Sequence, residues 1–157
     1  MSRFAWGGLL RRAGLQQISC LVAIGVWGAM AASQSVAVKI VENDRGGLIG
    51  ARAVEIAAIN ADSSRVELRG KFCYSSCTMY LGVSDLCISP TTAFGFHGPS
   101  RYGAVLSVPQ FEHWSRVMAM HYNAPLRDWF MREARHRITG YHRVSGAQLI
   151  ALGYPSC

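Results

Sequence analysis

The order of the segments between residues 36 and 81 constrains the fold most strongly. A β-branched run at residues 36–41 leads into a polar turn with paired glycines, and residues 48–61 then have the apolar spacing of an amphipathic helix. A second strand at residues 65–69, a turn that contains a glycine and a second helical run follow in the same order. Strand, turn and helix repeated in this way are typical of a parallel sheet with crossover helices. The sequence therefore predicts an α/β fold.

The rest of the chain extends this unit and adds helices. Strands are expected at residues 86–88 and 93–97, and helices at residues 109–122, 126–137 and 145–152. The two longer helices form a late helical insertion, and residues 36–157 make one domain. A loop at residues 98–103 is polar and rich in glycine, which favours a position at the border of a cleft.

The first 31 residues have the three parts of a secretory signal peptide. Three arginines without an acid precede an uncharged apolar run at residues 18–27, and Ala29-Met30-Ala31 supplies the small residues that a signal peptidase reads. The alternative is an uncleaved anchor, because the uncharged stretch at residues 13–38 is long enough to cross a bilayer. Cleavage near Ala31 is favoured, since both ends of that stretch are polar. We expect a periplasmic protein, or one anchored to the inner membrane and facing the periplasm.

Cysteine content and charge narrow the class of protein. Residues 32–157 contain four cysteines, and an even number in an oxidising compartment predicts two disulfides. A metal site is the alternative, but no CxxC or HxxxH spacing supports it, and no metal or organic cofactor is expected. Loss of residues 1–31 would lower the formal net charge from +7 to +4. With no run of basic residues, this mild charge indicates no nucleic-acid partner.

Residues 70–79 (GKFCYSSCTM), which we call the serine turn, hold the strongest candidate for a catalytic nucleophile. A strand precedes this segment and a helical run follows it. Ser75 therefore lies near the free N–H groups of the first helical turn. Cys73 and Cys77 frame this serine and are expected one helical turn apart. The alternative interpretation is a tight turn held by disulfides, whose serines only cap the helix.

A nucleophilic Ser75 needs a base and a place for negative charge to develop. His97 is the best placed of the five histidines, because it ends an apolar strand, and α/β folds carry their sites at strand ends. The alternative is a lone strand-end histidine that is partly buried and hydrogen-bonded and has no catalytic role. The N–H of Ser76 and a backbone N–H of Gly46 or Gly47 are the expected oxyanion donors.

Several separated stretches resemble the Clp protease/crotonase superfamily, and in particular its exported, periplasmic Clp-like branch. Residues 43–47 (NDRGG), which we call the glycine turn, resemble the family's Asn-Ser-Pro-Gly-Gly turn. The serine turn resembles the family's Gly-x-Ala-Ala-Ser-x-Gly motif, with Ser75 at the serine, and it has the Cys-x-Ser-x-Cys pattern of the exported branch. Residues 86–97 resemble the strand pair that ends in the catalytic histidine, and residues 145–154 resemble the closing helix. The resemblance implies a Clp/crotonase-like parallel sheet with crossover helices.

The chain departs from this family in two places. The aspartate that completes the family's triad has no counterpart, because Tyr141 and His142 stand in that region. His97 would then be oriented by a backbone carbonyl, by Tyr141 or by nothing. The resemblance covers residues 36–157 and lacks the family's first strand–helix units. The sheet is therefore expected to be shortened at its N-terminal side, with an edge that depends on a partner.

The resemblance also implies a disulfide pairing. Cys77, on the helix after Ser75, would join Cys87 on the next strand. Cys73 would then join Cys157 and tie the C-terminus to the serine turn.

Taken together, the resemblance implies an exported serine hydrolase, most simply a peptidase, with Ser75 as nucleophile and His97 as base. Its substrate would be a peptide or protein. Because the Clp fold commonly self-associates, a homo-oligomer is also expected, and membrane contact is expected only through residues 13–38 if they are uncleaved. The alternative from another class is a non-catalytic envelope module that keeps the fold for binding or assembly. An acyl-thioester enzyme of the crotonase type is less favoured, because an exported protein meets little coenzyme A.

Overall fold

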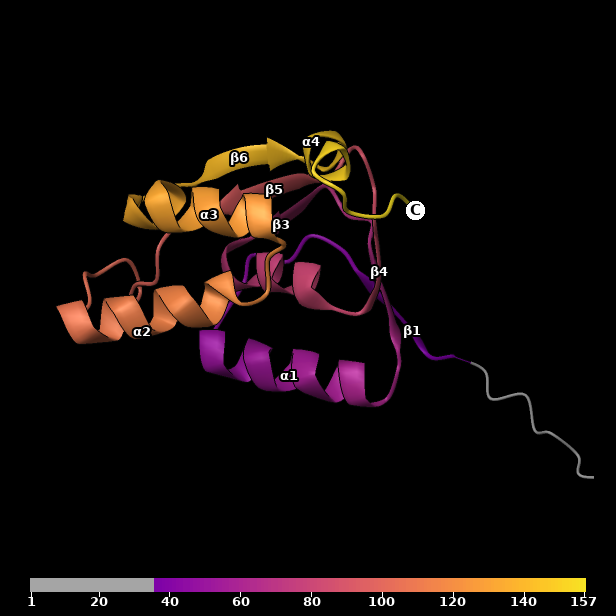
Figure 1. Cartoon of the computed structure of the whole chain (residues 1–157), viewed down its shortest axis with the longest axis horizontal. Coiled ribbons are helices and arrows are strands. Elements are labelled where there is room, and N and C mark those ends of the chain that lie inside the picture. Colours follow the sequence, from indigo (N-terminus) through magenta and orange to yellow (C-terminus); the bar gives the residue numbers. More distant parts are fainter. Residues whose placement is uncertain (1–35) are drawn as a thin grey trace, which may run out of the picture. The chain divides into compact units, whose positions relative to one another are not determined.

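Two small sheets and the helices around them make up residues 36–157, the part of the chain that the computed structural model describes (Figure 1). One sheet is parallel and contains β1 (Val38–Val41), β2 (Arg65–Leu68) and β4 (Asp85–Ile88). The other contains β3 (Phe72–Tyr74), β5 (Ala93–Phe96) and β6 (His142–Ser145), with β3 parallel and β6 antiparallel to β5. The helices are α1 (Ile49–Ala61), η1 (Ser75–Gly82), α2 (Val108–Ala119), α3 (Ala124–Arg132), η2 (Ala134–His136) and α4 (Gly146–Ala151). The predicted α/β class is confirmed.

The structure differs from the sequence prediction at the second helix and in the sheets. The helix that follows Ser75, η1, is a 3-10 helix, because its first residues are Ser, Ser, Cys and Thr, all weak α-helix formers. One parallel sheet was expected, whereas the structure has two small sheets, and one of them is mixed. The antiparallel member, β6, was not expected at all. Its sequence, HRVS, is polar and short, and its extended conformation depends on pairing with β5.

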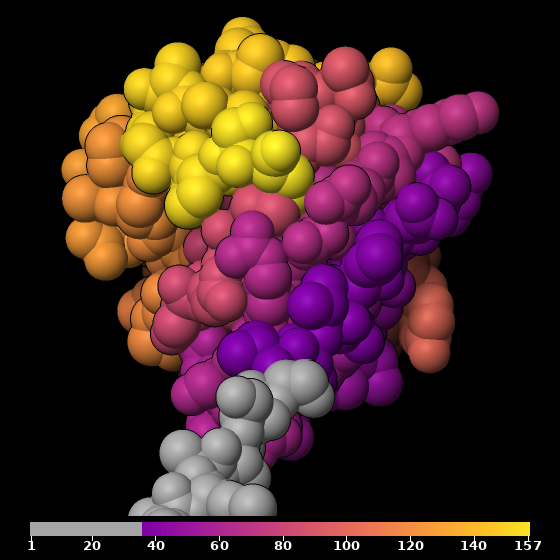
Figure 2. Space-filling model, turned by 90° about the vertical axis from the view of Figure 1, so that its right-hand side faces the viewer, coloured from indigo at the N-terminus to yellow at the C-terminus, as the bar shows by residue number. Residues whose placement is uncertain are grey.

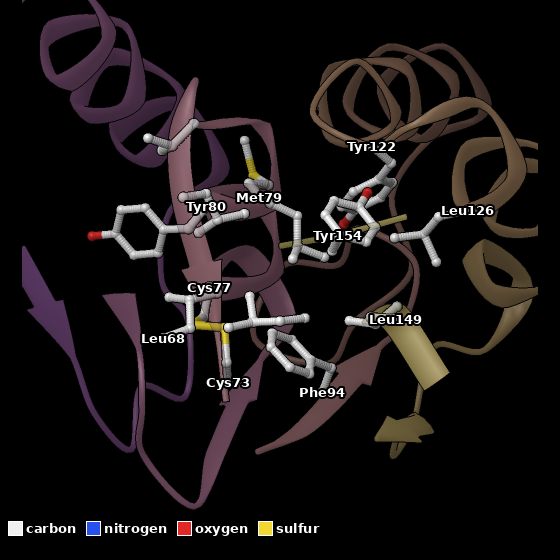
Figure 3. Close-up of a cluster of buried hydrophobic side chains, with 14 of the residues drawn as sticks. Leu68, Cys73, Cys77, Met79, Tyr80, Phe94, Tyr122, Leu126, Leu149 and Tyr154 are labelled. Carbon is white, nitrogen blue, oxygen red and sulfur yellow. A yellow bond between two sulfur atoms is a disulfide. The ribbon is translucent and has the colours of Figure 1, made fainter. Parts of the chain in front are cut away.

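The buried core surrounds the serine turn. Six consecutive residues of η1, from Ser76 to Leu81, are buried, and α1, α2, β3 and β5 all contact this helix. Met79 and Tyr80 project from η1 into a cluster of apolar side chains from other elements (Figure 3). Burial of large apolar side chains supplies most of the free energy of folding. Ser75 is therefore joined directly to the best-packed part of the domain.

The strand β1 lies at the edge of its sheet. Val38 and Ile40 are 52% and 57% exposed, and the indigo residues of this strand are open on the face that Figure 2 shows. Lys39, between them, points to the opposite side and pairs with Glu55 of α1 at 2.8 Å. Side chains alternate along a strand, so α1 covers one face of β1, and no other element within residues 36–157 covers the face of Val38 and Ile40.

The structure contains the disulfides Cys73–Cys77 and Cys87–Cys157. The predicted pairing of Cys77 with Cys87 and of Cys73 with Cys157 is therefore wrong. The C-terminal segment explains the difference, because it runs beside β4, where the N–H of Cys157 donates to the carbonyl of Ile88 at 3.0 Å. This contact brings Cys157 next to Cys87, and the yellow C-terminal residues lie against the strands in Figure 2. Cys73 in the middle of β3 then bonds to Cys77, with 5.3 Å between their Cα atoms.

These disulfides suggest an oxidising, exported environment. The predicted signal peptide at residues 1–31 lies outside the described residues, as does nearly all of the alternative anchor at residues 13–38. Within residues 36–157, no helix combines the length and the apolar character needed to cross a membrane.

Loss of the Cys87–Cys157 bridge should destabilise the fold strongly, because the bridge joins residues 70 positions apart. The chain-entropy relation gives about 4 kcal/mol for a loop of that length. We expect the Cys87→Ala/Cys157→Ala variant to lose about 4 kcal/mol of unfolding free energy in urea denaturation. As a control, parent and variant are compared under strong reducing conditions, where the difference should shrink because the parent then lacks the bridge too. Equal urea midpoints in oxidising buffer would contradict the pairing.

Candidate active site

Ser75 occupies the sharp turn between β3 and η1. Its φ is +58°, in the left-handed region that residues with a side chain seldom adopt. A conformation of this kind costs roughly 1–3 kcal/mol and persists only where surrounding contacts enforce it. A serine on a strained strand-to-helix turn presents its Oγ to the outside of the turn, and Ser75 lines a cavity. The interpretation that the serines cap the helix is wrong, since the N-cap of η1 is Tyr74 and no side chain caps it.

Hydrogen bonds on the core side of the serine turn hold it in place. The hydroxyl of Thr78 donates to the carbonyl of Ser75 at 2.7 Å. Because that proton is engaged, the hydroxyl of Tyr122 donates to the Thr78 oxygen, 2.7 Å away. Burial raises the pKa of Tyr122, so the phenol keeps the proton that this bond requires. The disulfide between Cys73 and Cys77 closes the turn on both sides of Ser75.

The glycine turn lies directly against the serine turn. Gly46 has a φ of +91°, and a Cβ at this position would lie 2.7 Å from the Cβ of Ser75 and 2.9 Å from the N of Ser76. Only glycine allows the two backbones to come so close. Two further bonds join the turns: the N–H of Tyr74 donates to the carbonyl of Asp44 at 2.9 Å, and the hydroxyl of Ser76 donates to the carbonyl of Gly47 at 3.1 Å.

An ion pair fixes the glycine turn to α1. One carboxylate oxygen of Asp44 accepts the N–H of Gly46 at 2.6 Å, and the other accepts a guanidinium N–H of Arg52 at 2.7 Å. The Arg52 guanidinium also lies over the ring of Tyr80 in η1, 4.2 Å from its centre. The side chain of Asp44 therefore sets the shape of the glycine turn, and Arg52 connects that shape to the core.

Three backbone N–H groups were predicted as oxyanion donors, those of Gly46, Gly47 and Ser76. The N–H of Gly46 is already engaged, because it donates to the carboxylate of Asp44 within the glycine turn. Within residues 36–157, the N–H groups of Gly47 and Ser76 donate to no other protein group. Gly46 therefore allows the close approach of the turns, while the N–H groups of Gly47 and Ser76 have no hydrogen-bond partner among residues 36–157. Two such donors beside a serine are the arrangement that stabilises a developing oxyanion.

His97 follows directly after β5 and is partly buried. Its Nδ1 lies 2.6 Å from the carbonyl oxygen of Gly98. A carbonyl only accepts, so Nδ1 carries the proton and Nε2 is free to act as a base. Burial lowers the pKa of His97, and the bond to the Gly98 carbonyl partly offsets this effect. Within residues 36–157, no carboxylate hydrogen-bonds to this ring.

Tyr141 contacts His97 through its ring. The two ring centres are 5.3 Å apart in an edge-on arrangement, and Tyr141 also stacks on Tyr74, at 4.6 Å. Tyr141 therefore packs on His97 and on Tyr74, the residue that precedes Ser75. Of the three alternatives for orienting His97, the backbone carbonyl makes the hydrogen bond, and Tyr141 contributes packing.

The segment around η2 also holds His97, a role that sequence reasoning missed. The N–H of Gly98 donates to the carbonyl of Arg137 at 2.9 Å. A side chain at Gly98 would collide with the carbonyl of Arg135. These residues are separated from His97 by about forty positions in the chain, and nothing in their local pattern indicates the contact.

One cavity of about 920 Å³ brings the candidate residues together, since Ser75, His97, Gly46 and Gly47 all line it. Ser76 is fully buried behind the wall. The loop predicted to border a cleft does so, because residues 98–102 line the cavity. The sequence analysis did not identify two further lining residues, Trp114 and Met118 of α2.

The contact between the turns should make Gly46 much less tolerant of substitution than its neighbour. We expect Gly46→Ala to lower the free energy of unfolding by about 1–3 kcal/mol, because its φ is positive and its Cβ meets the serine turn. Gly47→Ala is the matched control, since its Cβ would have no atom within 4 Å, and its effect should stay below about 1 kcal/mol. Urea denaturation measures both changes. Equal losses in the two variants would contradict the described contact.

Comparison with known proteins adds no family assignment. No protein-family model matches this chain, and no curated protein matches it significantly.

Proposed function

We propose that residues 36–157 form an exported serine hydrolase, a peptidase, with Ser75 as nucleophile and His97 as general base. One observation carries the proposal: a serine with a φ of +58° and a histidine with a free Nε2 line the same cavity. Residues in strained backbone conformations concentrate at functional sites.

The chemistry follows from the roles of these groups. His97 Nε2 accepts the proton of the Ser75 hydroxyl as Oγ attacks the carbonyl carbon of a peptide bond. The N–H groups of Gly47 and Ser76 stabilise the oxyanion that forms. The imidazolium then gives its proton to the leaving amine, and an acyl-serine remains. A water molecule, deprotonated by the same histidine, hydrolyses that ester and restores Ser75.

The missing carboxylate should make this reaction slow. The imidazolium intermediate is disfavoured because the ring is partly buried and only the carbonyl of Gly98 accepts from Nδ1. In an enzyme with a full triad, loss of the carboxylate function costs about 10⁴-fold in rate. A low turnover is therefore part of the proposal.

A Clp/crotonase-like fold and membership of the exported branch are also part of the proposal. They are supported by the contact between the glycine turn and the serine turn, since both motifs of the resemblance meet at one cavity. The disulfide that frames Ser75 supports an exported setting. That setting favours a peptide substrate over a coenzyme A thioester.

A second candidate function is a binding module that has lost catalysis. One observation favours it: the ring of His97 has only a neutral backbone partner. The two candidates differ in whether Ser75 reacts, and a single labelling experiment separates them.

A fluorophosphonate probe should label Ser75 covalently, because such probes react with activated serines. We expect labelling in the parent chain and none in Ser75→Ala. Ser100→Ala is the matched control, since Ser100 lines the same cavity and its loss should leave labelling intact. His97→Gln should slow labelling by about 10²-fold or more. Undiminished labelling of Ser75→Ala, or an unlabelled parent, would refute the hydrolase and leave the binding module.

The pH dependence of labelling tests the role of His97. Its pKa lies below the ordinary value of 6.5, and a base acts only when it is unprotonated. The labelling rate should therefore rise with pH, reach half of its maximum below pH 6.5 and stay level above about pH 7.5. In His97→Gln the rate should be low and nearly flat over this range. A half-maximum above pH 6.5 would be inconsistent with a buried, carboxylate-free base.

A further inference from the structure

The cavity beside Ser75 has an uneven charge. Its wall contains the side chains of Arg45 and Arg101, and among residues 36–157 no aspartate or glutamate lines it. One arginine comes from the glycine turn and the other from the loop after His97, so the two loops that border the candidate active site each contribute a positive charge.

Neither of these arginines makes an ion pair, unlike five other arginines among residues 36–157. Arg52, Arg65, Arg69, Arg116 and Arg135 all pair with carboxylates. Arg45 and Arg101 have no carboxylate within ion-pair distance in the described part of the chain. The acid nearest in sequence to Arg45 is Asp44, and both of its oxygens are engaged, by Gly46 and Arg52. The positive charge at the cavity is therefore uncompensated.

Local contacts restrain the side chain of Arg45 and the backbone of Arg101. The guanidinium of Arg45 lies over the ring of Phe72, 4.9 Å from its centre. Arg101 is joined to Ala104 by reciprocal backbone hydrogen bonds of 3.0 and 2.9 Å. A guanidinium in a defined position binds a carboxylate with two parallel hydrogen bonds.

Much of the rest of the wall is apolar, although Ser100 and Gln110 also line it. Ile49, Leu106, Trp114 and Met118 line the cavity, and the Trp114 ring packs 3.4 Å from the Cβ position of Gly50. At the mouth, Leu48 and Tyr102 are 74% and 99% exposed. A ligand that fits this surface has an apolar side chain for the wall and a negative charge for the arginines.

We propose that the substrates of this site are acidic peptides, in which an apolar residue stands next to a carboxylate. The carboxylate would be held by Arg45 and Arg101 and the apolar side chain by the wall around Trp114. This inference rests on the proposed peptidase function and adds the chemical class of its substrate.

The preference for acidic peptides can be measured as binding to the Ser75→Ala variant, which lacks the proposed nucleophile and cannot cleave them. Full-length Ser75→Ala protein is titrated calorimetrically with peptides in which a central leucine is flanked by Glu, Gln or Lys, all with amidated C-termini. We expect the Glu peptide to bind about 3–10-fold more tightly than the Gln peptide, and the Lys peptide to bind most weakly. A Gln peptide with a free C-terminal carboxylate forms a fourth arm, and tighter binding there would identify the chain end as the source of the charge.

Variants of Arg45 and Arg101 test whether the cavity causes the preference for acidic peptides. Added to Ser75→Ala, Arg45→Gln and Arg101→Gln should each reduce the preference for the carboxylate, as should a rise in salt from 0.05 to about 0.5 M. Arg143→Gln is the matched control, because Arg143 is also exposed but lies on β6 and does not line the cavity. Equal or undetectable binding of all peptides, or an equal effect of Arg143→Gln, would overturn the inference. Failure of this inference can be distinguished from failure of the proposed hydrolase. Labelling of Ser75 in the parent chain by the uncharged fluorophosphonate probe tests only the hydrolase.

Discussion

The contact between Gly46 and the backbone of Ser75 and Ser76 is the constraint on which the rest of the site depends. It requires a residue without a side chain at a positive φ, and it requires the glycine turn to keep its shape. Asp44 supplies that shape by accepting both the N–H of Gly46 and the guanidinium of Arg52. Through Arg52 and Tyr80 the contact extends into the core. The position of Ser75, and that of the proposed oxyanion donors, thus depends on one close approach between two turns.

The strain at Ser75 is opposed by interactions on every side. The disulfide between Cys73 and Cys77 spans it, and the hydroxyl of Thr78 binds its carbonyl from within the core. Because η1 is buried along almost its whole length, relaxation of the turn would disturb the packing of the domain. The strain is therefore local, whereas the interactions that maintain it are distributed over several elements.

His97 is held differently. Its ring is positioned by the carbonyl of Gly98 and by contact with Tyr141, and neither partner stabilises a positive charge as a carboxylate does. Burial shifts the ring toward its neutral form. This is favourable for accepting a proton and unfavourable for holding one. Such a base is consistent with the proposed slow turnover. The proposed anionic ligand rests on Arg45 and Arg101, which line the same cavity and pair with no carboxylate among residues 36–157.

The local pattern of the sequence determined the α/β class, the turns that carry Gly46 and Ser75, and the position of His97 at a strand end. Each of these depends on residues within a few positions of one another, where propensity, glycine and hydrophobic period carry the information. Only the tertiary structure decided the disulfide pairing, the strand β6, the partner of His97 Nδ1 and the lining of the cavity by Trp114. Cys157 reaches Cys87 because the C-terminal segment runs beside β4, and Gly98 meets residues 135–137 because η2 packs behind it. These contacts join residues tens of positions apart, and their geometry exists only after the elements have packed.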